Sequence, residues 1–174
     1  DDEQSAAMQE MIEQITSGHQ YRNYETSAFA QAGKESRHNM NYWLFGDYVG
    51  IGAGAHSKIS FADRIVRQMR YKQPKEYLAK AKAAESLIQA QHVLIPEDRG
   101  FEFMMNALRL TGGFETSLFQ ERTGLPISAI KKPLDEAEQR LLIVRNNLHI
   151  NPTVLGRRFL NDLLQIFLPE ANSQ

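Results

Sequence analysis

The segment HNMNYW, residues 38–43, holds the side chains best suited to ligand chemistry. A neutral imidazole such as that of His38 can serve as an axial ligand of heme iron, and the rings of Tyr42 and Trp43 can lie against a macrocycle. The alternative is structural: His38 would hydrogen-bond backbone groups in a polar loop, with both aromatic residues as core anchors. Asn39 suits a turn-capping role, because its amide can hydrogen-bond nearby backbone groups.

A glycine-rich stretch, GIGAGA, follows at residues 50–55. It formally fits the dinucleotide pattern GxGxxA, but that fingerprint leads directly into a helix, whereas SKISFA follows here. The small residues instead indicate a strand end whose backbone approaches a ligand closely, or a tight barrel corner without a ligand. His56 is either a second ligand contact or a structural histidine.

Two further groups of charged residues have types that can contact a ligand. Glu25 lies on a predicted strand, where it either points inward to a substrate or is exposed to solvent. Residues 64–82 contain seven basic side chains and one acidic side chain, Glu76. This stretch either receives carboxylates such as propionates, with Arg64 and Arg67 as the best candidates, or forms a solvated surface.

Composition excludes several classes of chemistry. The 174 residues are enough for one domain or two small ones, and the net charge of −1 argues against a protein that mainly binds nucleic acid. With no cysteine, the chain has no disulfide, thiolate nucleophile, zinc knuckle or cysteine-held iron–sulfur cluster. No apolar run approaches the roughly 20 residues of a membrane helix, and the acidic start is unlike a secretory signal. The composition predicts a cytoplasmic protein without a membrane span.

The elements that must position these residues begin with an amphipathic helix. Apolar residues repeat at helical spacing over residues 8–15, and Gly18 is placed to end the helix. Residues 21–30 predict one strand, and residues 47–52 suggest a buried strand end. The stretch KISFADRIVRQMRYK, residues 58–72, predicts two short strands joined by a turn. The first part of the chain therefore has α/β character.

The second part of the chain is predicted to be mainly helical. LLIVRNNLHI, residues 141–150, has the form of a small hairpin. Pro133 must break or kink the helix in which it lies, because proline cannot donate a backbone hydrogen bond. Asn151 and Pro152 have the types of a helix cap and first-turn residue. The predicted helical stretches are 75–92, 101–108, 127–141 and 151–167. Their order around the hairpin is close to a winged-helix arrangement.

Several motifs taken together resemble a known family. YETSAFA, HNMNYW, GDYVGIGAGAHS, FEFMMNALRL and LGRRFLNDLLQIFL occur in the order found in the C-terminal part of oxygen-independent coproporphyrinogen III oxidase-like radical S-adenosylmethionine proteins. HNxxYW resembles the heme chaperone branch of that family, HemW. The family's CxxxCxxC motif, whose thiolates hold a [4Fe–4S] cluster, is absent. The chain is therefore expected to be the C-terminal fragment of a longer protein.

The resemblance implies a fold that is α/β in its first part and mainly α in its second. Residues 1–72 would form the C-terminal portion of a partial radical-SAM (β/α) barrel. Residues 73–96 would form a helical connector. Residues 97–174 would form a small helical, winged-helix-like domain, the C-terminal domain of the family.

The resemblance also implies a function, namely a chaperone that binds heme and delivers it to a heme-acceptor protein of respiratory type. The alternative is the C-terminal part of an oxidase that decarboxylates propionates in porphyrin biosynthesis. The full-length parent would use a [4Fe–4S] cluster and S-adenosylmethionine, and this cysteine-free chain alone should be inactive as an enzyme. The implied contacts are His38, Tyr42 and Trp43 with heme, His38 being the ligand of its iron, and Gly52, Ala53, Gly54 and Ala55 with S-adenosylmethionine; Glu25 would contact substrate or S-adenosylmethionine.

Overall fold

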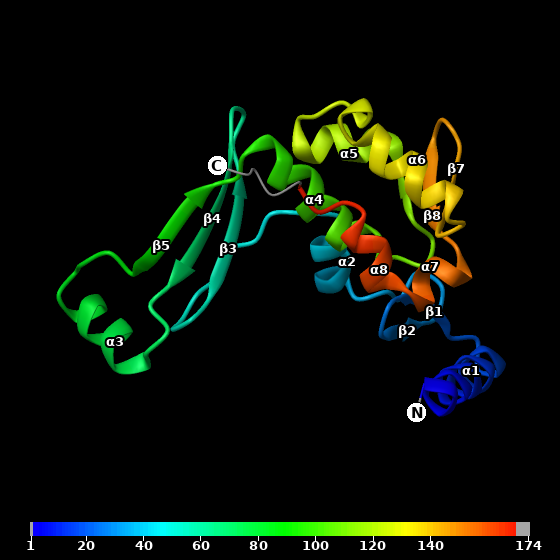
Figure 1. Ribbon diagram of the computed structural model, residues 1–174. Helices are drawn as coiled ribbons and strands as arrows, with labels where there is room; N and C mark the ends of the chain where they lie inside the picture. Colours follow the sequence, from blue (N-terminus) through cyan, green and yellow to red (C-terminus); the bar gives the residue numbers. More distant parts are fainter. Residues whose placement is uncertain (1, 170–174) are drawn as a thin grey trace.

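Three antiparallel sheets and a set of short helices make up the fold in the computed structural model, which describes residues 2–169 (Figure 1). The strands are β1 (Arg22–Glu25), β2 (Ala28–Ala30), β3 (His56–Ser60), β4 (Ile65–Arg70), β5 (Ile88–Val93), β6 (Phe114–Glu115), β7 (Ile143–Arg145) and β8 (His149–Pro152). The helices are α1 (Asp2–Gly18), α2 (Arg37–Trp43), α3 (Pro74–Lys82), α4 (Pro96–Ala107), α5 (Thr116–Thr123), the 3-10 helix η1 (Ile127–Ile130), α6 (Lys131–Gln139), α7 (Val154–Arg158) and α8 (Leu160–Gln165).

Helix α1 confirms the predicted N-terminal helix, and Gly18 is its last residue. Its apolar stripe does not enter the core: Met8, Met11, Ile12 and Ile15 are between 45% and 60% exposed. The helix lies at one end of the molecule, next to β1, where Glu10 forms an ion pair with Arg158 (Figure 1). The described part of the chain thus leaves the apolar face of α1 uncovered.

The strand predicted over residues 21–30 is in fact a hairpin. β1 and β2 pair antiparallel, and the side-chain amide of Asn23 donates to the carbonyls of Glu25 (2.6 Å) and Ala28 (3.2 Å). Those bonds close a turn at Thr26 and Ser27, residue types that favour turns because their hydroxyls can hydrogen-bond nearby backbone. The prediction of a single strand is therefore wrong.

The β3–β4–β5 sheet extends away from the helical part of the molecule, with α3 at its far end (Figure 1). β3 and β4 confirm the two strands predicted over residues 58–72. The helix predicted over residues 75–92 is wrong in its second half, because α3 ends at Lys82 and residues 88–93 form β5 beside β4. The residues of this segment are compatible with either a helix or a strand, and pairing with β4 determines that they form a strand.

The hydrophobic core lies in the second half of the chain, around α4. Phe103 of α4 is fully buried and makes edge-to-face contacts with Phe45, Phe114 and Phe119, at centroid distances of 5.8, 5.0 and 5.2 Å. α5 covers this cluster but was not predicted. The interruption predicted at Pro133 lies earlier, between η1 and α6, so the proline falls in the first turn of α6, where no backbone donor is needed.

The predicted hairpin over residues 141–150 is confirmed by β7 and β8. Asn146 holds the turn, since its Oδ1 accepts hydrogen bonds from the backbone of Leu148 (2.8 Å) and His149 (2.9 Å). The helix start predicted at Asn151 and Pro152 is wrong, because both residues belong to β8. The hydroxyl of Thr153 caps α7 instead, and the last helical stretch is divided at Phe159.

The mixed α and β composition agrees with the predicted fold class at this coarse level. All strand pairs among residues 2–169 are antiparallel. The partial barrel over residues 1–72, the connector over 73–96 and the winged-helix-like domain over 97–174 remain predictions. Between residues 2 and 169, no helix combines the length and apolarity needed to cross a membrane.

Candidate functional site

His38 lies in the first turn of α2, not in the polar loop that was predicted. The helix begins after Ser36, whose hydroxyl accepts a hydrogen bond from the backbone of Asn39 (3.3 Å). The Asn39 side chain contacts this cap, since its Oδ1 accepts a hydrogen bond from the Ser36 hydroxyl (3.3 Å), and its Nδ2 donates to the hydroxyl of Tyr24 on β1 (3.4 Å). A serine cap and a tie to β1 therefore fix the start of the helix that carries His38.

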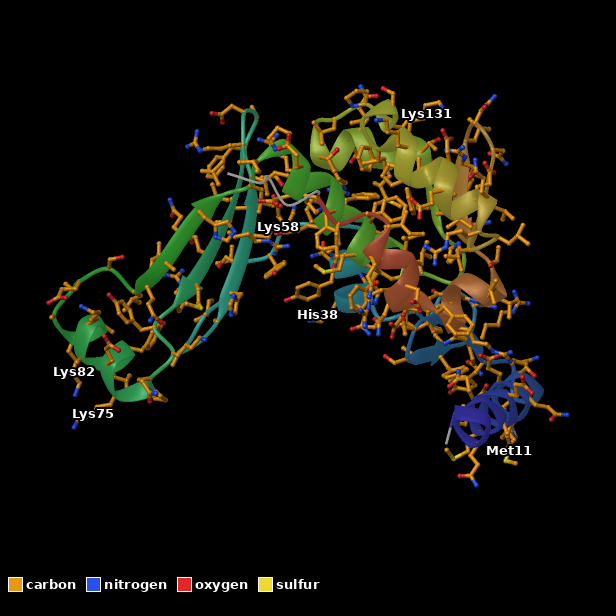
Figure 2. All side chains as sticks on the ribbon, in the orientation of Figure 1. Met11, His38, Lys58, Lys75, Lys82 and Lys131 are labelled. Carbon is orange, nitrogen blue, oxygen red and sulfur yellow. The ribbon has the colours of Figure 1, made fainter. Side chains whose placement is uncertain are left out.

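A row of aromatic rings leads from His38 toward the β3–β4–β5 sheet. The imidazole is exposed at the surface of α2 and lies edge-on to Tyr42, with centroids 4.7 Å apart (Figure 2). Tyr42 in turn contacts Tyr48 at 4.4 Å, and Nη1 of Arg67 donates to the Tyr48 hydroxyl at 2.7 Å. The structure thus brings together three predicted residues, His38, Tyr42 and Arg67.

Trp43 does not join this row through any ring contact found among residues 2–169. Its ring is half-buried and lies beneath the guanidinium of Arg109, 4.7 Å from the centroid. The indole Nε1 is buried without a hydrogen-bond partner in the described part of the chain. Trp43 and His38 therefore occupy different surroundings, although only four residues lie between them in sequence.

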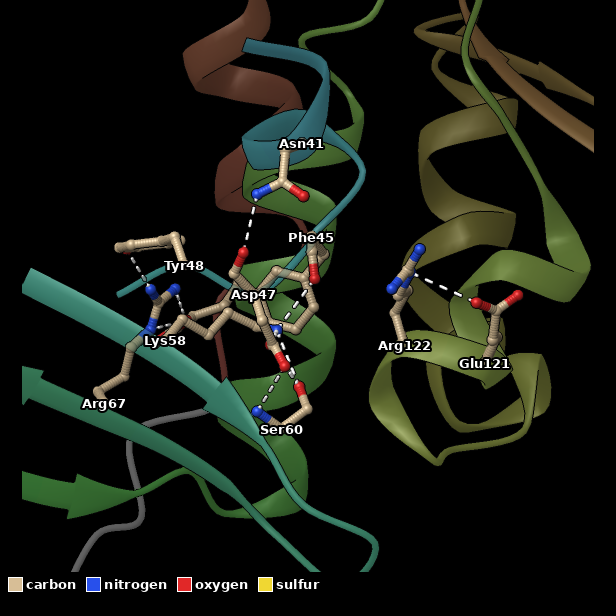
Figure 3. Close-up of polar contacts among 10 residues, drawn as sticks. Asn41, Phe45, Asp47, Tyr48, Lys58, Ser60, Arg67, Glu121 and Arg122 are labelled. Atoms are coloured by element: carbon tan, nitrogen blue, oxygen red, sulfur yellow. Dashed lines mark hydrogen bonds and ion pairs between the residues drawn. The ribbon is translucent and has the colours of Figure 1, made fainter. Parts of the chain in front are cut away.

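A polar cluster around Lys58 lies next to Tyr48 and Arg67 (Figure 3). The Lys58 side chain is 1% exposed, and its Nζ donates to Asp47 (2.9 Å), to the Phe45 carbonyl (3.0 Å) and to Ser60 (3.1 Å). The ammonium also lies 4.1 Å from the Phe45 ring centroid. Phe45 has a left-handed backbone, φ 55°, which aims its carbonyl at Lys58.

The pKa values of this pair follow from burial and pairing. Burial lowers the pKa of Lys58 from its ordinary 10.5, although Asp47 opposes the change. Burial raises the pKa of Asp47, but hydrogen bonds from Lys58 and Ser60 outweigh this effect and bring that pKa below 3.8. The cluster is therefore a charged anchor between the loop after α2 and strand β3.

Both arginines predicted to receive propionates already have carboxylate partners. Arg67 forms a two-point ion pair with Glu102 of α4, in which Nε donates at 2.9 Å. Arg64 lies at the tip of the β3–β4 hairpin and pairs with its neighbour Asp63 at 2.8 Å. A ligand carboxylate at either arginine would have to compete with these groups.

The glycine stretch lies at the opposite end of the β3–β4 hairpin from Arg64. Val49 and Ile51 are 65% and 87% exposed, so the predicted buried strand end over residues 47–52 is wrong. Gly52 and Gly54 have φ values of 106° and 73°, and Gly54 donates a hydrogen bond to the Tyr71 carbonyl (2.8 Å). The stretch is a turn, and Ala55 also accepts a backbone hydrogen bond from Arg70 (2.8 Å).

Glu25 is 1% exposed, so its side chain points into the protein and the exposed alternative is wrong. Oε1 accepts a hydrogen bond from Ser27 at 3.2 Å. Oε2 is buried and has no hydrogen-bond partner among the residues described. His56 begins β3 with its side chain exposed.

The described residues do not fit an iron–sulfur cluster. The chain has no cysteine, and residues 2–169 contain no group of three or more histidine, aspartate or glutamate side chains placed to hold a metal. Cluster ligands must come from cysteine thiolates, with histidine as an occasional substitute. No chemistry through such a cluster is therefore assigned to these residues.

Sequence reasoning missed Tyr48, Lys58 and Arg109. Tyr48 and Lys58 flank the glycine stretch in sequence, and a bridge joins their backbones across it. Arg109 occurs in the quoted motif FEFMMNALRL, but an arginine after a helix carries no signal of the aromatic ring beneath it. Only the approach of α2 to the end of α4 reveals that contact.

The sequence is similar to a known domain family and to several named proteins. Residues 94–159 match the family model of the HemN C-terminal domain. The chain is 45% identical over 152 residues to "Heme chaperone HemW" of Haemophilus influenzae, covering 86% of this chain and 38% of that protein. It is 38% identical over 151 residues to "Heme chaperone HemW" of Escherichia coli, covering 86% and 39%. The chain thus spans about two fifths of these relatives.

A solved structure has a similar fold. It is described as coproporphyrinogen III oxidase (HemN) from Escherichia coli, a radical SAM enzyme, and it matches with a TM-score of 0.65 over 92% of this chain and 39% of that one. The sequence identity is 16%, so this match shows a similarity of fold only. Together the comparisons confirm the predicted resemblance to the coproporphyrinogen III oxidase-like family and to its heme chaperone branch.

Proposed function

We propose that this chain, as a relative of the HemW proteins of the coproporphyrinogen III oxidase-like radical SAM family, belongs to a chaperone that binds heme and passes it to an acceptor. Two proteins named heme chaperones are 45% and 38% identical to this chain over 86% of its length. Heme is the cargo in this proposal. The acceptor would be a heme protein of respiratory type, and delivery would take place in the cytoplasm.

The observation that carries the proposal is the exposed imidazole of His38. Its ring nitrogens have no hydrogen-bond partner among residues 2–169, whereas a structural histidine normally uses one of them. The Ser36 cap and the edge contact with Tyr42 orient the ring. An accessible nitrogen on a fixed helix suits a weak, reversible axial ligand of heme iron.

Tyr42 and Tyr48 would offer ring surfaces to the macrocycle beside His38. The heme contact predicted for Trp43 has no support in this geometry, because its ring lies beneath Arg109 and outside this row. Arg64 and Arg67 would receive propionates in competition with Asp63 and Glu102. Arginine suits this role because its planar fork matches a carboxylate. The exposed Arg64 is the easier of the two to release from its partner, since surface pairs are weak.

In the full-length parent, residues 1–72 would complete a radical-SAM barrel and residues 97–174 would form its winged-helix-like C-terminal domain. Gly52, Ala53, Gly54 and Ala55 would contact S-adenosylmethionine at this turn. A contact of Glu25 with S-adenosylmethionine or substrate would require its buried, unpartnered Oε2 to become accessible. The [4Fe–4S] cluster would depend on cysteines outside this chain.

A heme titration followed by Soret absorbance tests the role of His38, with thermal unfolding measured in parallel. His38→Ala should remove the ligand-dependent Soret band and leave the melting temperature unchanged, because the side chain is exposed. His92→Ala is the matched control, since His92 is an exposed histidine on β5. Equal affinity and an equal spectrum for the His38 variant and wild type would refute the assignment.

A further inference from the structure

We propose that a cavity between α1, the β1–β2 hairpin and helices α7 and α8 binds a small anion bearing a carboxylate or phosphate group, with Arg109 as its principal contact. The cavity has a volume of about 180 Å³. That volume holds several waters, each of which occupies about 30 Å³ in the liquid, or one small anion. His38, Tyr42 and Trp43 are not among the residues that line it, although Trp43 contacts Arg109, so the proposal goes beyond heme binding.

Arg109 is partly buried, and no hydrogen bond or ion pair of its side chain is found among the described residues. Its guanidinium covers the Trp43 ring at 4.7 Å, and its Nε is buried with no hydrogen-bond acceptor among the described residues. An arginine keeps its charge at all accessible pH values, and leaving a buried charged donor unpaired costs free energy. A bound carboxylate or phosphate would supply the missing acceptor in a fork geometry.

The charges around the cavity favour an anion. Three arginines and two glutamates line it, which leaves a net charge of +1. Glu10 is already paired with Arg158 at 2.6 Å, and Glu13 accepts a hydrogen bond from Gln9 at 3.0 Å. Arg109 and Arg157 remain without an ion-pair partner in the described part of the chain.

Hydrogen bonds hold the wall that carries Arg109 in place. The hydroxyl of Thr26 donates to the Arg109 carbonyl (3.4 Å), and the hydroxyl of Thr111 donates to the Asn23 carbonyl (2.8 Å). The residue after Arg109, Leu110, forms a backbone bridge with Glu25. The backbone of Arg109 is therefore fixed against the β1–β2 hairpin, and this preorganisation lowers the ordering cost of binding.

Trp43 provides the readout, because it is the only tryptophan of the chain and lies against Arg109. Sodium phosphate and sodium succinate would be titrated separately into the full chain, with chloride keeping ionic strength constant. We expect a saturable change in Trp43 emission with at least one probe. Saturation by phosphate alone would assign a phosphate-bearing ligand, and saturation by succinate alone a carboxylate. No saturable change with either probe would overturn the proposal.

Variants test whether the response arises in this cavity. Arg109→Gln should weaken binding of the effective probe about tenfold, as expected for the loss of one charge-assisted contact. Arg157→Gln, at an exposed position, should also weaken binding without a risk to folding. Arg140→Gln, which does not line the cavity and is already paired with Glu136, should bind like wild type. Unchanged affinity in both the Arg109 and Arg157 variants would refute the anion site. That result would not bear on heme binding, which the Soret titration measures separately.

Discussion

Nζ of Lys58 lies 2.9 Å from Oδ1 of Asp47, with the lysine side chain 1% exposed and the aspartate side chain 45% exposed. The pair is thus asymmetric: a buried cation depends on a carboxylate at the surface. The same carboxylate also accepts hydrogen bonds from the backbone and hydroxyl of Ser60, at 2.9 and 2.8 Å. Asp47 therefore compensates the cost of burying the Lys58 charge, and this dependence can be measured.

Replacing Asp47 should destabilise the protein far more than its partial exposure suggests. Asp47→Ala leaves a buried ammonium without its counterion, so we expect the free energy of unfolding to fall by about 2 kcal/mol or more. Urea denaturation measures the change. Asp63→Ala is the matched control, because the exposed Asp63–Arg64 pair should contribute no more than about 0.5 kcal/mol. Equal effects of the two substitutions would contradict the anchoring role of Asp47.

The same pair predicts how stability depends on pH. The folded-state pKa of Asp47 is below 3.8, so its contribution is present above that value and is lost as pH falls through the lowered pKa. Urea unfolding from about pH 5 down to about pH 2 should therefore show a steeper loss of stability in wild type than in Asp47→Asn. Parallel curves for the two proteins would show that Asp47 does not contribute.

Lys58 affects how the stability of the protein depends on pH in the alkaline range. Its pKa in the folded protein is below 10.5, so the unfolded chain holds the extra proton between the lowered pKa and 10.5. The contribution of Lys58 to stability therefore rises with pH across that window. Lys58→Met should remove this rise. Titration of other groups contributes equally to both proteins, so the difference between their curves is the quantity to compare.

Phe103 should be the most sensitive aromatic position of the core. It is fully buried against three other phenylalanine rings, and Phe103→Ala should lower the free energy of unfolding by about 3–5 kcal/mol. Trp43→Ala should cost less, because the indole is only half-buried. Phe61→Ala, at a ring that is 49% exposed, is the control. A Trp43 effect as large as that of Phe103 would contradict this order.

Limited proteolysis tests the predicted boundary between residues 72 and 98. Lys75 and Lys82 project from α3 at the far end of the sheet, so trypsin should cut there first (Figure 2). Because β5 remains paired with β4, the two fragments should stay together in size-exclusion chromatography while separating on a denaturing gel. A first cut within residues 50–55 would refute this division of the chain, and fragments that separate would contradict the pairing of β5 with β4.

Local chemistry made part of this fold predictable from the sequence. The hairpins β3–β4 and β7–β8 were predicted because strand alternation and turn residues are encoded within a few neighbouring positions. The helical spacing of residues 8–15 likewise predicted α1. The segment of residues 38–43 was predicted as the candidate site, but as a loop, because the capping role of Ser36 was not recognised.

Tertiary contacts decided the remaining features. Residues 88–93 form a strand because β4 offers a free edge, and residues 151 and 152 continue β8 because β7 lies beside them. Tertiary contacts also decided the arrangement of the candidate sites. The sequence by itself determined only which histidine, aromatic and arginine side chains were present. Only the packing of α2, α4 and the sheet placed Tyr48 beside Tyr42 and Arg109 over Trp43. Such contacts join residues far apart in sequence, and no local pattern records them.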